Sequence, residues 1–320
     1  KPITLRNVNI ENYHTFARGY LGSLGKMPAS HGICYPDNCL QYVNQAIKNI
    51  EARYQPSVFF KRPIDFFSDE IKWVLSHGIE EKEDYERAER IGRIGTRLSR
   101  NLRPVMFEIV EEYLRLRKEN GWPYDWDDIA LHVKNELEND NRQRFYKHII
   151  IDEGQDFSPA MIRSLAYAIP EDGSLTFFGD VVQQIYGQRM SWRSAGLNIP
   201  QQWNFRENYR NTKQIAQFAL AISSMPFFKD IPDIVEPTSP KADGPLPTIA
   251  FCKDENQQIK IALETATKAS KTQSVAILVK NRSQEKIFSS QLGNNATRLH
   301  RDLNIWKDGP GIFGSGLKTT

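Results

Sequence analysis

The 320-residue sequence is poor in cysteine and has no long hydrophobic run. Its three cysteines, Cys34, Cys39 and Cys252, form no Cys-x-x-Cys pair and lie near no histidine cluster, which argues against structural zinc and for a reducing compartment. No apolar stretch approaches the roughly 18 to 20 residues that cross a bilayer. We therefore expect a soluble, cytoplasmic protein without a membrane partner.

The sequence also lacks an excess of either charge. Its 42 Lys and Arg residues nearly balance 39 Asp and Glu residues, so the net charge of +3 does not by itself indicate a nucleic-acid partner. The hydrophobic share of 40% and the aromatic share of 11% exclude a disordered or low-complexity chain. The length predicts two domains, or one domain with a large insertion.

The pattern of apolar residues changes three times along the chain. Alternation around Ile3 to Ile10 predicts a strand, and a helix is expected from Tyr13. Residues 31–144 carry apolar positions at helical spacing, which predicts a helical insertion. Strands are then expected at 147–152 and 174–180, with a helix that begins at Ser158-Pro159 between them. Strand, helix and strand in this order are typical of a parallel sheet.

A second α/β unit is expected after a proline-rich segment. A helix after Arg210 should end near Ser224, and the six prolines of residues 226–247 indicate a linker. Beyond the linker we expect a strand at 248–252, a helix at 255–270 and a strand at 274–279.

Two carboxylates, Asp152 and Glu153, follow the apolar run Ile149 to Ile151. The carboxyl end of a strand in an open parallel sheet is where ligands bind. One acid there can hold Mg²⁺ while the other orients and deprotonates an attacking water. The alternative is that the two acids have no chemical role and only mark the point where the strand reaches the protein surface.

The sequence that follows Asp152 and Glu153 favours a catalytic role for these two acids. Asp152-Glu153-Gly154-Gln155-Asp156 is followed by Gly179-Asp180-Val181-Val182-Gln183-Gln184-Ile185-Tyr186-Gly187 and then by Asn208-Tyr209-Arg210. In this order and spacing the segments resemble the DEGQD, GDxxQxIY and NYR motifs of superfamily 1 helicases of the UvrD/Rep type. Tyr13-His14-Thr15-Phe16-Ala17 resembles the TFHSFA motif of that family, and residues 124–129 resemble the segment that closes its helical 1B insertion.

The resemblance implies an α/β fold with a RecA-like parallel-sheet motor domain 1A formed by residues 1–30 and 145–225. Residues 31–144 would be the 1B insertion, 226–247 a linker, and 248–320 the start of a second RecA-like domain, 2A. It also implies ATP and Mg²⁺ as cofactors and single-stranded or partly duplex DNA as the track. RNA stays open, because contacts that follow a backbone are similar for both.

The resemblance further assigns residues to roles. Asp152 and Glu153 would bind the metal, with Glu153 also the catalytic base, while Gln183 would sense the γ-phosphate and Arg210 would stabilise its charge. The residues that would contact the nucleotide are Gln155 and Tyr186. Those that would contact DNA are His14, Phe16, Arg189 and Trp192. His14 could instead cap its helix, and Tyr186 and Trp192 could be packed aromatics at a domain boundary.

One further pattern points to nucleic acid independently of the family. Arginines recur every three or four residues at Arg87, Arg90, Arg93, Arg97, Arg100 and Arg103. At this spacing they should line one side of a helix. Ile91, Ile94, Leu98 and Leu102 would lie on the opposite side. Such a stripe, with Arg90, Arg93 and Arg97 at its centre, would bind phosphates without sequence preference. A solvated basic face balanced by neighbouring glutamates is the alternative.

The phosphate-binding motif G-x-x-x-x-G-K-[ST] does not occur in these residues. Gly311 to Thr320 imitates it but places Leu317 before Lys318, and Gly314-Ser315-Gly316 has the composition of an engineered linker. In the family this loop precedes the TFHSFA-like segment, so we expect the middle of a longer helicase or translocase that is inactive as an ATPase alone. A nuclease or a repair or defence protein is an expected partner. The alternative is a non-catalytic docking module for DNA or protein.

Overall fold

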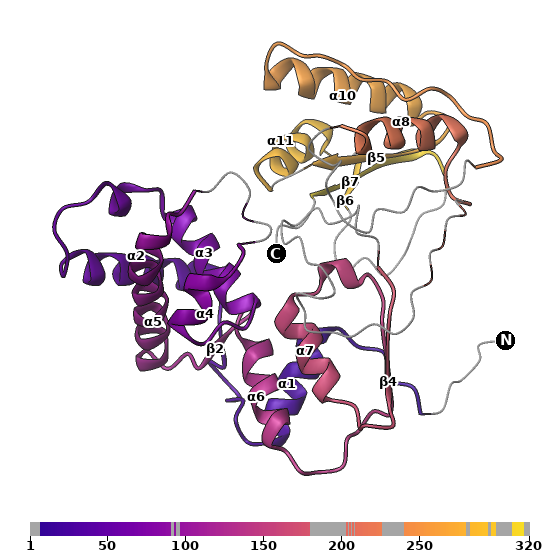
Figure 1. The fold of residues 1–320 in the computed structure, drawn as a ribbon. Helices are drawn as coiled ribbons and strands as arrows, with labels where there is room; N and C mark the ends of the chain where they lie inside the picture. Colours follow the sequence, from indigo (N-terminus) through magenta and orange to yellow (C-terminus); the bar gives the residue numbers. More distant parts are fainter. Residues whose placement is uncertain are drawn as a thin grey trace. The chain divides into compact units, whose positions relative to one another are not determined.

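The computed structural model describes residues 7–90, 93, 97–179, 203, 205, 207, 209–225, 240–279, 282–293, 296–298 and 309–316. It has an α/β fold with many helices and small parallel sheets (Figure 1). The chain divides into two compact units, one within residues 1–205 and 226–235 and the other within residues 206–225 and 236–320. Within the described ranges, no helix is both long and apolar enough to cross a membrane.

The first unit contains a two-stranded parallel sheet flanked by helices. The sheet pairs β3 (His148–Ile151) with β4 (Ser174–Phe177), and the helices packed near it are α1 (Tyr13–Ser23), α6 (Ile129–Asn139) and α7 (Pro159–Tyr167). Both α1 and α7 begin at side-chain caps, because Asn12 accepts a bond of 2.9 Å from the Thr15 amide and Ser158 accepts one of 3.3 Å from the Met161 amide. The predicted strand, helix and parallel strand are thus confirmed.

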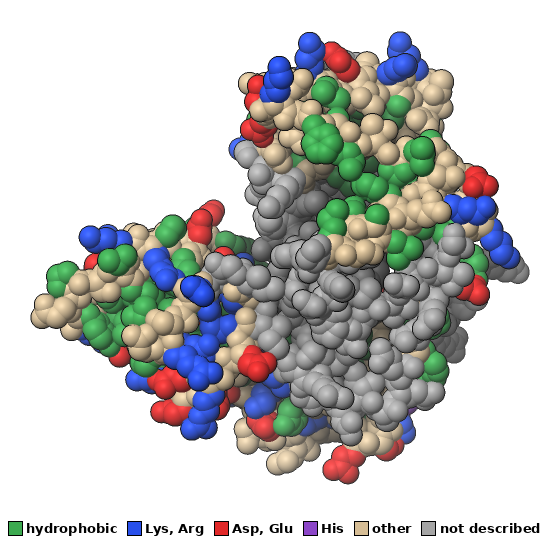
Figure 2. Space-filling view, turned by 45° about the horizontal axis from the view of Figure 1, so that its top comes forward, with side chains coloured by type: hydrophobic (Ala, Val, Ile, Leu, Met, Phe, Trp, Pro, Cys, Tyr) green, Lys and Arg blue, Asp and Glu red, His purple; other side chains and the backbone are tan. Residues whose placement is uncertain are grey.

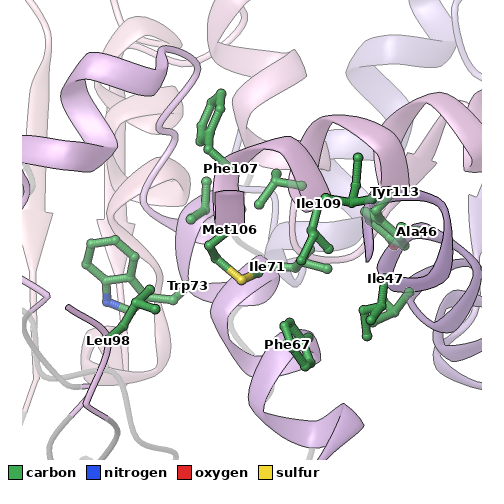
Figure 3. Packing of buried hydrophobic residues seen from close by; sticks show 14 of the residues in the cluster. Ala46, Ile47, Phe67, Ile71, Trp73, Leu98, Met106, Phe107, Ile109 and Tyr113 are labelled. Atoms are coloured by element: carbon green, nitrogen blue, oxygen red, sulfur yellow. The ribbon is translucent and has the colours of Figure 1, made fainter. Parts of the chain in front are cut away.

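A helical segment with its own core lies between α1 and α6. Its elements are α2 (Pro36–Glu51), η1 (Val58–Lys61), α3 (Ile64–Ser76), α4 (Lys82–Arg87), η2 (Arg100–Leu102) and α5 (Arg103–Glu119). Side chains of α2, α3 and α5 interdigitate in this core, among them Ile47, Phe67, Ile71 and Met106 (Figure 3). The chain enters and leaves the segment through β1 (Ile33–Cys34) and β2 (Tyr124–Asp125), which pair in parallel. The expected helical character is confirmed, whereas the exact domain boundaries stay predictions.

The second unit contains a three-stranded parallel sheet. Its strands lie in the order β5 (Ser274–Val279), β7 (Gly311–Gly316) and β6 (Ala296–Arg298). Its helices are α8 (Lys213–Ser223), α10 (Glu255–Ala269) and α11 (Arg282–Leu292). The predicted helices after Arg210 and near 255–270 and the strand at 274–279 are confirmed.

Three expectations from the sequence were wrong. Residues 7–10 of the first predicted strand form a turn and irregular structure, and residues 248–252 form no strand. Ile249 and Phe251 are instead 59% and 92% exposed, so these large apolar side chains have no sheet to pack against. The linker-like Gly314-Ser315-Gly316 belongs to β7, the central strand of its sheet. All three residues pair with β5 and Gly314 also pairs with β6, and this pairing outweighs poor strand propensity.

Candidate functional site

The carboxyl ends of β3 and β4 are tied together by backbone hydrogen bonds. Ile151 lies opposite Phe177 in the parallel register. Past the strands, the Phe178 amide donates to the Ile151 carbonyl at 2.8 Å, and the Gly154 amide donates to the Phe178 carbonyl at 2.8 Å. The turn that follows β3 is therefore held against the end of β4, so that the acids of the first motif lie at the edge where parallel sheets bind ligands.

The ring of Phe177 packs between two glycines of different motifs. A Cβ on Gly154 would lie 1.9 Å from the Phe177 Cζ, and one on Gly179 would lie 2.8 Å from its Cε1. The same Cβ on Gly179 would be 3.2 Å from the Gln155 Oε1. The start of the GDxxQ segment thus packs directly on the DEGQD turn, which requires glycine at both positions.

The acids of this turn are open to solvent. Asp152 and Glu153 are exposed, and Glu153 adopts a left-handed backbone with φ of 51°. The Asp152 Oδ1 accepts a bond of 3.0 Å from the Glu153 amide. The Gln155 Nε2 donates to the Glu153 Oε2 at 2.6 Å, which orients that carboxylate. A strained backbone at an acidic residue is the kind of feature that clusters at functional sites.

The donor set of the turn suits Mg²⁺ bound jointly with phosphates. Exposed carboxylate oxygens of Asp152 and Glu153 are hard ligands, and Mg²⁺ usually takes one or two carboxylates together with water and substrate oxygens. In the described part of the chain no group of three or more His, Cys, Asp and Glu residues is placed to hold a metal. Asp156 nearby has a raised pKa, because burial and the charge of Glu153 both disfavour its ionised form.

The predicted DNA contacts His14 and Phe16 lie on α1. Burial lowers the pKa of His14, against a hydrogen bond to the Trp126 backbone, and the His14 Nε2 is buried without a partner among the described residues. The imidazole meets the Trp126 ring edge-on at 4.8 Å. His14 does not cap its helix, because Asn12 does. Phe16 is half-buried and stacks on Tyr20 with ring centroids 6.4 Å apart.

Among the described residues of the segment 87–103 the predicted arginine-bearing helix is not formed, and this expectation was wrong. α4 ends at Arg87, residues 88–90 and 97–99 have no regular secondary structure, and α5 begins only at Arg103. Pro104 lies in the first turn of that helix, where its ring is tolerated, whereas it would break a helix interior. Arg103 is buried and its Nη1 donates to carbonyls at the end of α4, including that of Glu86 at 2.6 Å.

The central arginines of the proposed stripe turn inward onto one buried acid. The side chains of Arg90 and Arg93 are only 9% and 11% exposed, and Glu70 on α3 is fully buried. Arg90 makes contacts of 2.6 and 2.5 Å to the two Glu70 oxygens, and the Arg93 Nε donates to Oε2 at 2.9 Å. Burial opposes ionisation of Glu70, but bonds from Arg90 and Tyr85 outweigh it and hold its pKa below the usual range. A phosphate would have to compete with this carboxylate.

The side chains of other arginines in the same series are exposed to solvent. Arg87, Arg97 and Arg100 are exposed. Basic side chains gather on the surface of the helical segment in the view of Figure 2, with acidic side chains beside them. Of the predicted DNA contacts in this segment, only Arg97 keeps an exposed side chain.

Four predicted site residues lie outside the described residues, namely Gln183, Tyr186, Arg189 and Trp192. Arg210 is described and exposed, and it precedes α8, whose Thr212 cap accepts from the Ile215 amide. It belongs to the second unit. The role of Arg210 therefore stays a prediction.

The sequence reasoning missed a buried ion-pair network in the segment 124–129. Arg117, only 2% exposed, makes a 2.5 Å contact with Asp125 Oδ2 and also bonds Asp128. The Tyr113 hydroxyl donates to the same Asp125 oxygen at 2.6 Å. Asp125 Oδ1 in turn accepts from the Asp128 amide at 2.9 Å. The Asp-x-x-Asp spacing was the available signal, but nothing in it identifies Arg117 as the partner.

The comparisons with known proteins agree with this geometry. Residues 4–204 match the family model of the UvrD/REP helicase N-terminal domain. The ATP-dependent DNA helicase UvrD2 of Mycobacterium tuberculosis is 24% identical over 196 residues, which cover 57% of this chain and 28% of the relative, and that of Mycobacterium bovis matches equally. A probable DNA helicase II homolog of Mycoplasma capricolum is 32% identical over 107 residues, covering 28% of this chain and 14% of the relative.

The chain thus spans less than a third of the length of these relatives. The family match, however, extends over more than half of this chain and includes the helical segment, the DEGQD turn and the GDxxQ segment. On this evidence the chain belongs to the UvrD/Rep helicase family.

Proposed function

We propose that this chain is part of an ATP-dependent DNA helicase or translocase that couples ATP hydrolysis to movement along a single strand. The observation that carries the proposal is the contact between Gly179 and Gln155, because it joins two helicase motifs at the carboxyl edge of β3 and β4. The relatives named above are DNA helicases, which favours DNA over RNA as the track.

The DEGQD turn is the proposed ATP and Mg²⁺ site. Asp152 and Glu153 would hold the metal, which supplies neutralisation of phosphate charge when bound. Glu153 is the proposed base that accepts the proton of the attacking water, and the hydrogen bond from Gln155 keeps its carboxylate in one orientation. Gln183 and Tyr186 would complete the nucleotide contacts and Arg210 would stabilise charge on the transferring phosphoryl group.

The proposed DNA contacts come from α1 and from the helical segment. His14 and Phe16 would meet the strand from α1, although the His14 Nε2 itself is buried. Arg97 is exposed and able to contact phosphate, as would Arg189 and Trp192. Contacts by Arg90 and Arg93 stay a prediction, which their pairing with Glu70 weakens.

The two units are proposed to be RecA-like, the first as domain 1A with its 1B insertion and the second as part of domain 2A. Parallel strands in both units support this reading. Because G-x-x-x-x-G-K-[ST] is absent from the 320 residues, the chain alone is proposed to hydrolyse ATP too slowly to be useful.

The test is the ATPase activity of the full-length gene product, with and without single-stranded DNA, for the wild type and for Glu153→Gln. Glu171→Gln, at an exposed glutamate of the same unit, is the matched control. We expect DNA-stimulated turnover in the wild type and the control, and a loss of about a hundredfold to ten-thousandfold in Glu153→Gln. DNA binding without turnover in the wild type would instead identify a docking module and overturn the proposal.

A further inference from the structure

Two of the three cysteines meet where the chain enters the helical segment. Cys34 ends β1, and Cys39 lies in the first turns of α2, which begins at Pro36. The Cys39 Sγ donates to the Cys34 carbonyl at 3.5 Å, the Cys34 Sγ donates to the Tyr35 carbonyl at 3.9 Å, and the two thiols lie close enough to influence each other's pKa. Cys34 is fully buried, whereas Cys39 is partly exposed. A reagent from solvent would therefore reach Cys39 first.

The surroundings make the two thiols chemically different. The hydrogen bond from Cys34 lowers the pKa of Cys39, although burial opposes this. The amino-terminal end of α2 and the nearby Arg117 guanidinium also favour the thiolate, while Asp125 opposes it. The bond to Cys39 and burial raise the pKa of Cys34. Cys39 is thus the nucleophile of the pair and Cys34 the neighbouring thiol.

We propose that Cys34 and Cys39 form a redox-sensitive pair that a peroxide converts into a disulfide. The Cys39 thiolate attacks hydrogen peroxide to give Cys39 sulfenic acid and hydroxide. The Cys34 thiol then attacks the sulfenic sulfur, forming the S–S bond and releasing water. Peroxide is reduced by two electrons and the two thiols are oxidised by two electrons.

The position of the pair gives the disulfide a structural consequence. Cys34 pairs with Asp125 in the β1–β2 ladder, and Asp125 bonds Arg117 and Tyr113. A covalent link from Cys34 to Cys39 would fasten the start of α2 to this ladder. Oxidation would therefore stiffen the base of the helical segment, independently of any ATPase role.

The experiment treats the native 320-residue chain with hydrogen peroxide, blocks remaining thiols by alkylation, and measures tryptic peptides by mass spectrometry. Cleavage after Lys26 and Lys48 leaves both cysteines in one peptide. We expect this peptide to lose the mass of two hydrogen atoms and to take up no alkyl group, and dithiothreitol to restore both alkylation sites. The peptide that contains Cys252 serves as the internal control for general oxidation.

Variants separate the two roles. In Cys34→Ser the sulfenic acid on Cys39 should persist and be trapped by dimedone, whereas Cys39→Ser should leave Cys34 reduced. Circular dichroism verifies that each variant is folded. The proposal is overturned if the wild-type peptide 27–48 still takes up two alkyl groups after Cys252 has been oxidised, or if the disulfide appears only in urea.

Discussion

Gln155 and Glu153 share a hydrogen bond of 2.6 Å at the end of β3, so an amide side chain fixes the carboxylate that we propose as the base. Gln155→Ala removes the donor and leaves Glu153 free to rotate. Under the proposed function we expect kcat of the full-length protein to fall by about a hundredfold while KM for ATP changes little, because positioning is lost and binding is not.

Steady-state ATPase kinetics check this prediction, with Gln143→Ala, at an exposed glutamine, as the control. An unchanged kcat in Gln155→Ala would show that the hydrogen bond does not position Glu153. A rise in KM with an unchanged kcat would indicate a role in binding alone.

Gly154→Ala should destabilise the first unit, because the new methyl group would overlap the Phe177 ring. We expect a loss of about 1–3 kcal/mol in the free energy of unfolding, the usual cost of overpacking. Gly19→Ala is the matched control, since a Cβ there meets nothing within 4 Å and alanine favours the helix. Urea unfolding measures both, and equal midpoints for the two variants would contradict the expectation.

Glu70→Ala should be among the most destabilising substitutions in the helical segment. It leaves Arg90 and Arg93 nearly buried without their shared carboxylate, which costs about 3–5 kcal/mol for a broken buried ion pair. Glu83→Ala, at an exposed position of α4, should change stability by less than about 0.5 kcal/mol. Thermal and urea unfolding are the measurements, and a small effect of Glu70→Ala would mean that solvent reaches both guanidinium groups.

His77 should make the stability of the first unit depend on pH. Burial lowers its pKa from 6.5 to about 4, against the hydrogen bond to the Trp73 carbonyl. Between these values the unfolded chain binds a proton that the folded chain does not, so stability falls as pH drops from about 6.5 to about 4. The total is about 3 kcal/mol, and little further change from this group is expected below that range.

The measurement is urea unfolding of the wild type and His77→Gln across this pH range. The difference in unfolding free energy between them should shrink as pH falls, because only the wild type loses this contribution. His31→Asn, at an exposed histidine with φ of 59° that asparagine tolerates, should run parallel to the wild type. A pH-independent difference for His77→Gln would refute the assignment.

The elements that sequence patterns predicted well are those with a strong local signal. Ser158-Pro159 marks the start of α7, and the apolar run before Asp152 forms β3 as expected. The acids of the site follow that strand, so their place at the sheet edge could be inferred. Phe177, however, looked like an ordinary apolar strand residue, and only the fold shows that two glycines enclose its ring.

The failures concern contacts between residues far apart in sequence. The arginine spacing from 87 to 103 suits a helix, yet Arg90 and Arg93 pair with Glu70, and a new helix begins at Arg103 with Pro104 in its first turn. Periodicity measures local repetition and contains no information about a buried acid on another helix. In β7 the local signal fails in the other direction, since its glycines do not favour a strand and pairing with β5 along its whole length creates one.

The short β1–β2 ladder places the departure and return points of the chain side by side, with Ile33 opposite Tyr124 and Cys34 opposite Asp125. The segment 35–123 therefore begins and ends at adjacent positions of the first unit. A segment with adjacent ends is modular, because the entropy of closing it as a loop changes only slowly with its length. Recombination or design could lengthen, shorten or exchange it while the strand ends that carry Asp152 and Glu153 keep their own supporting helices.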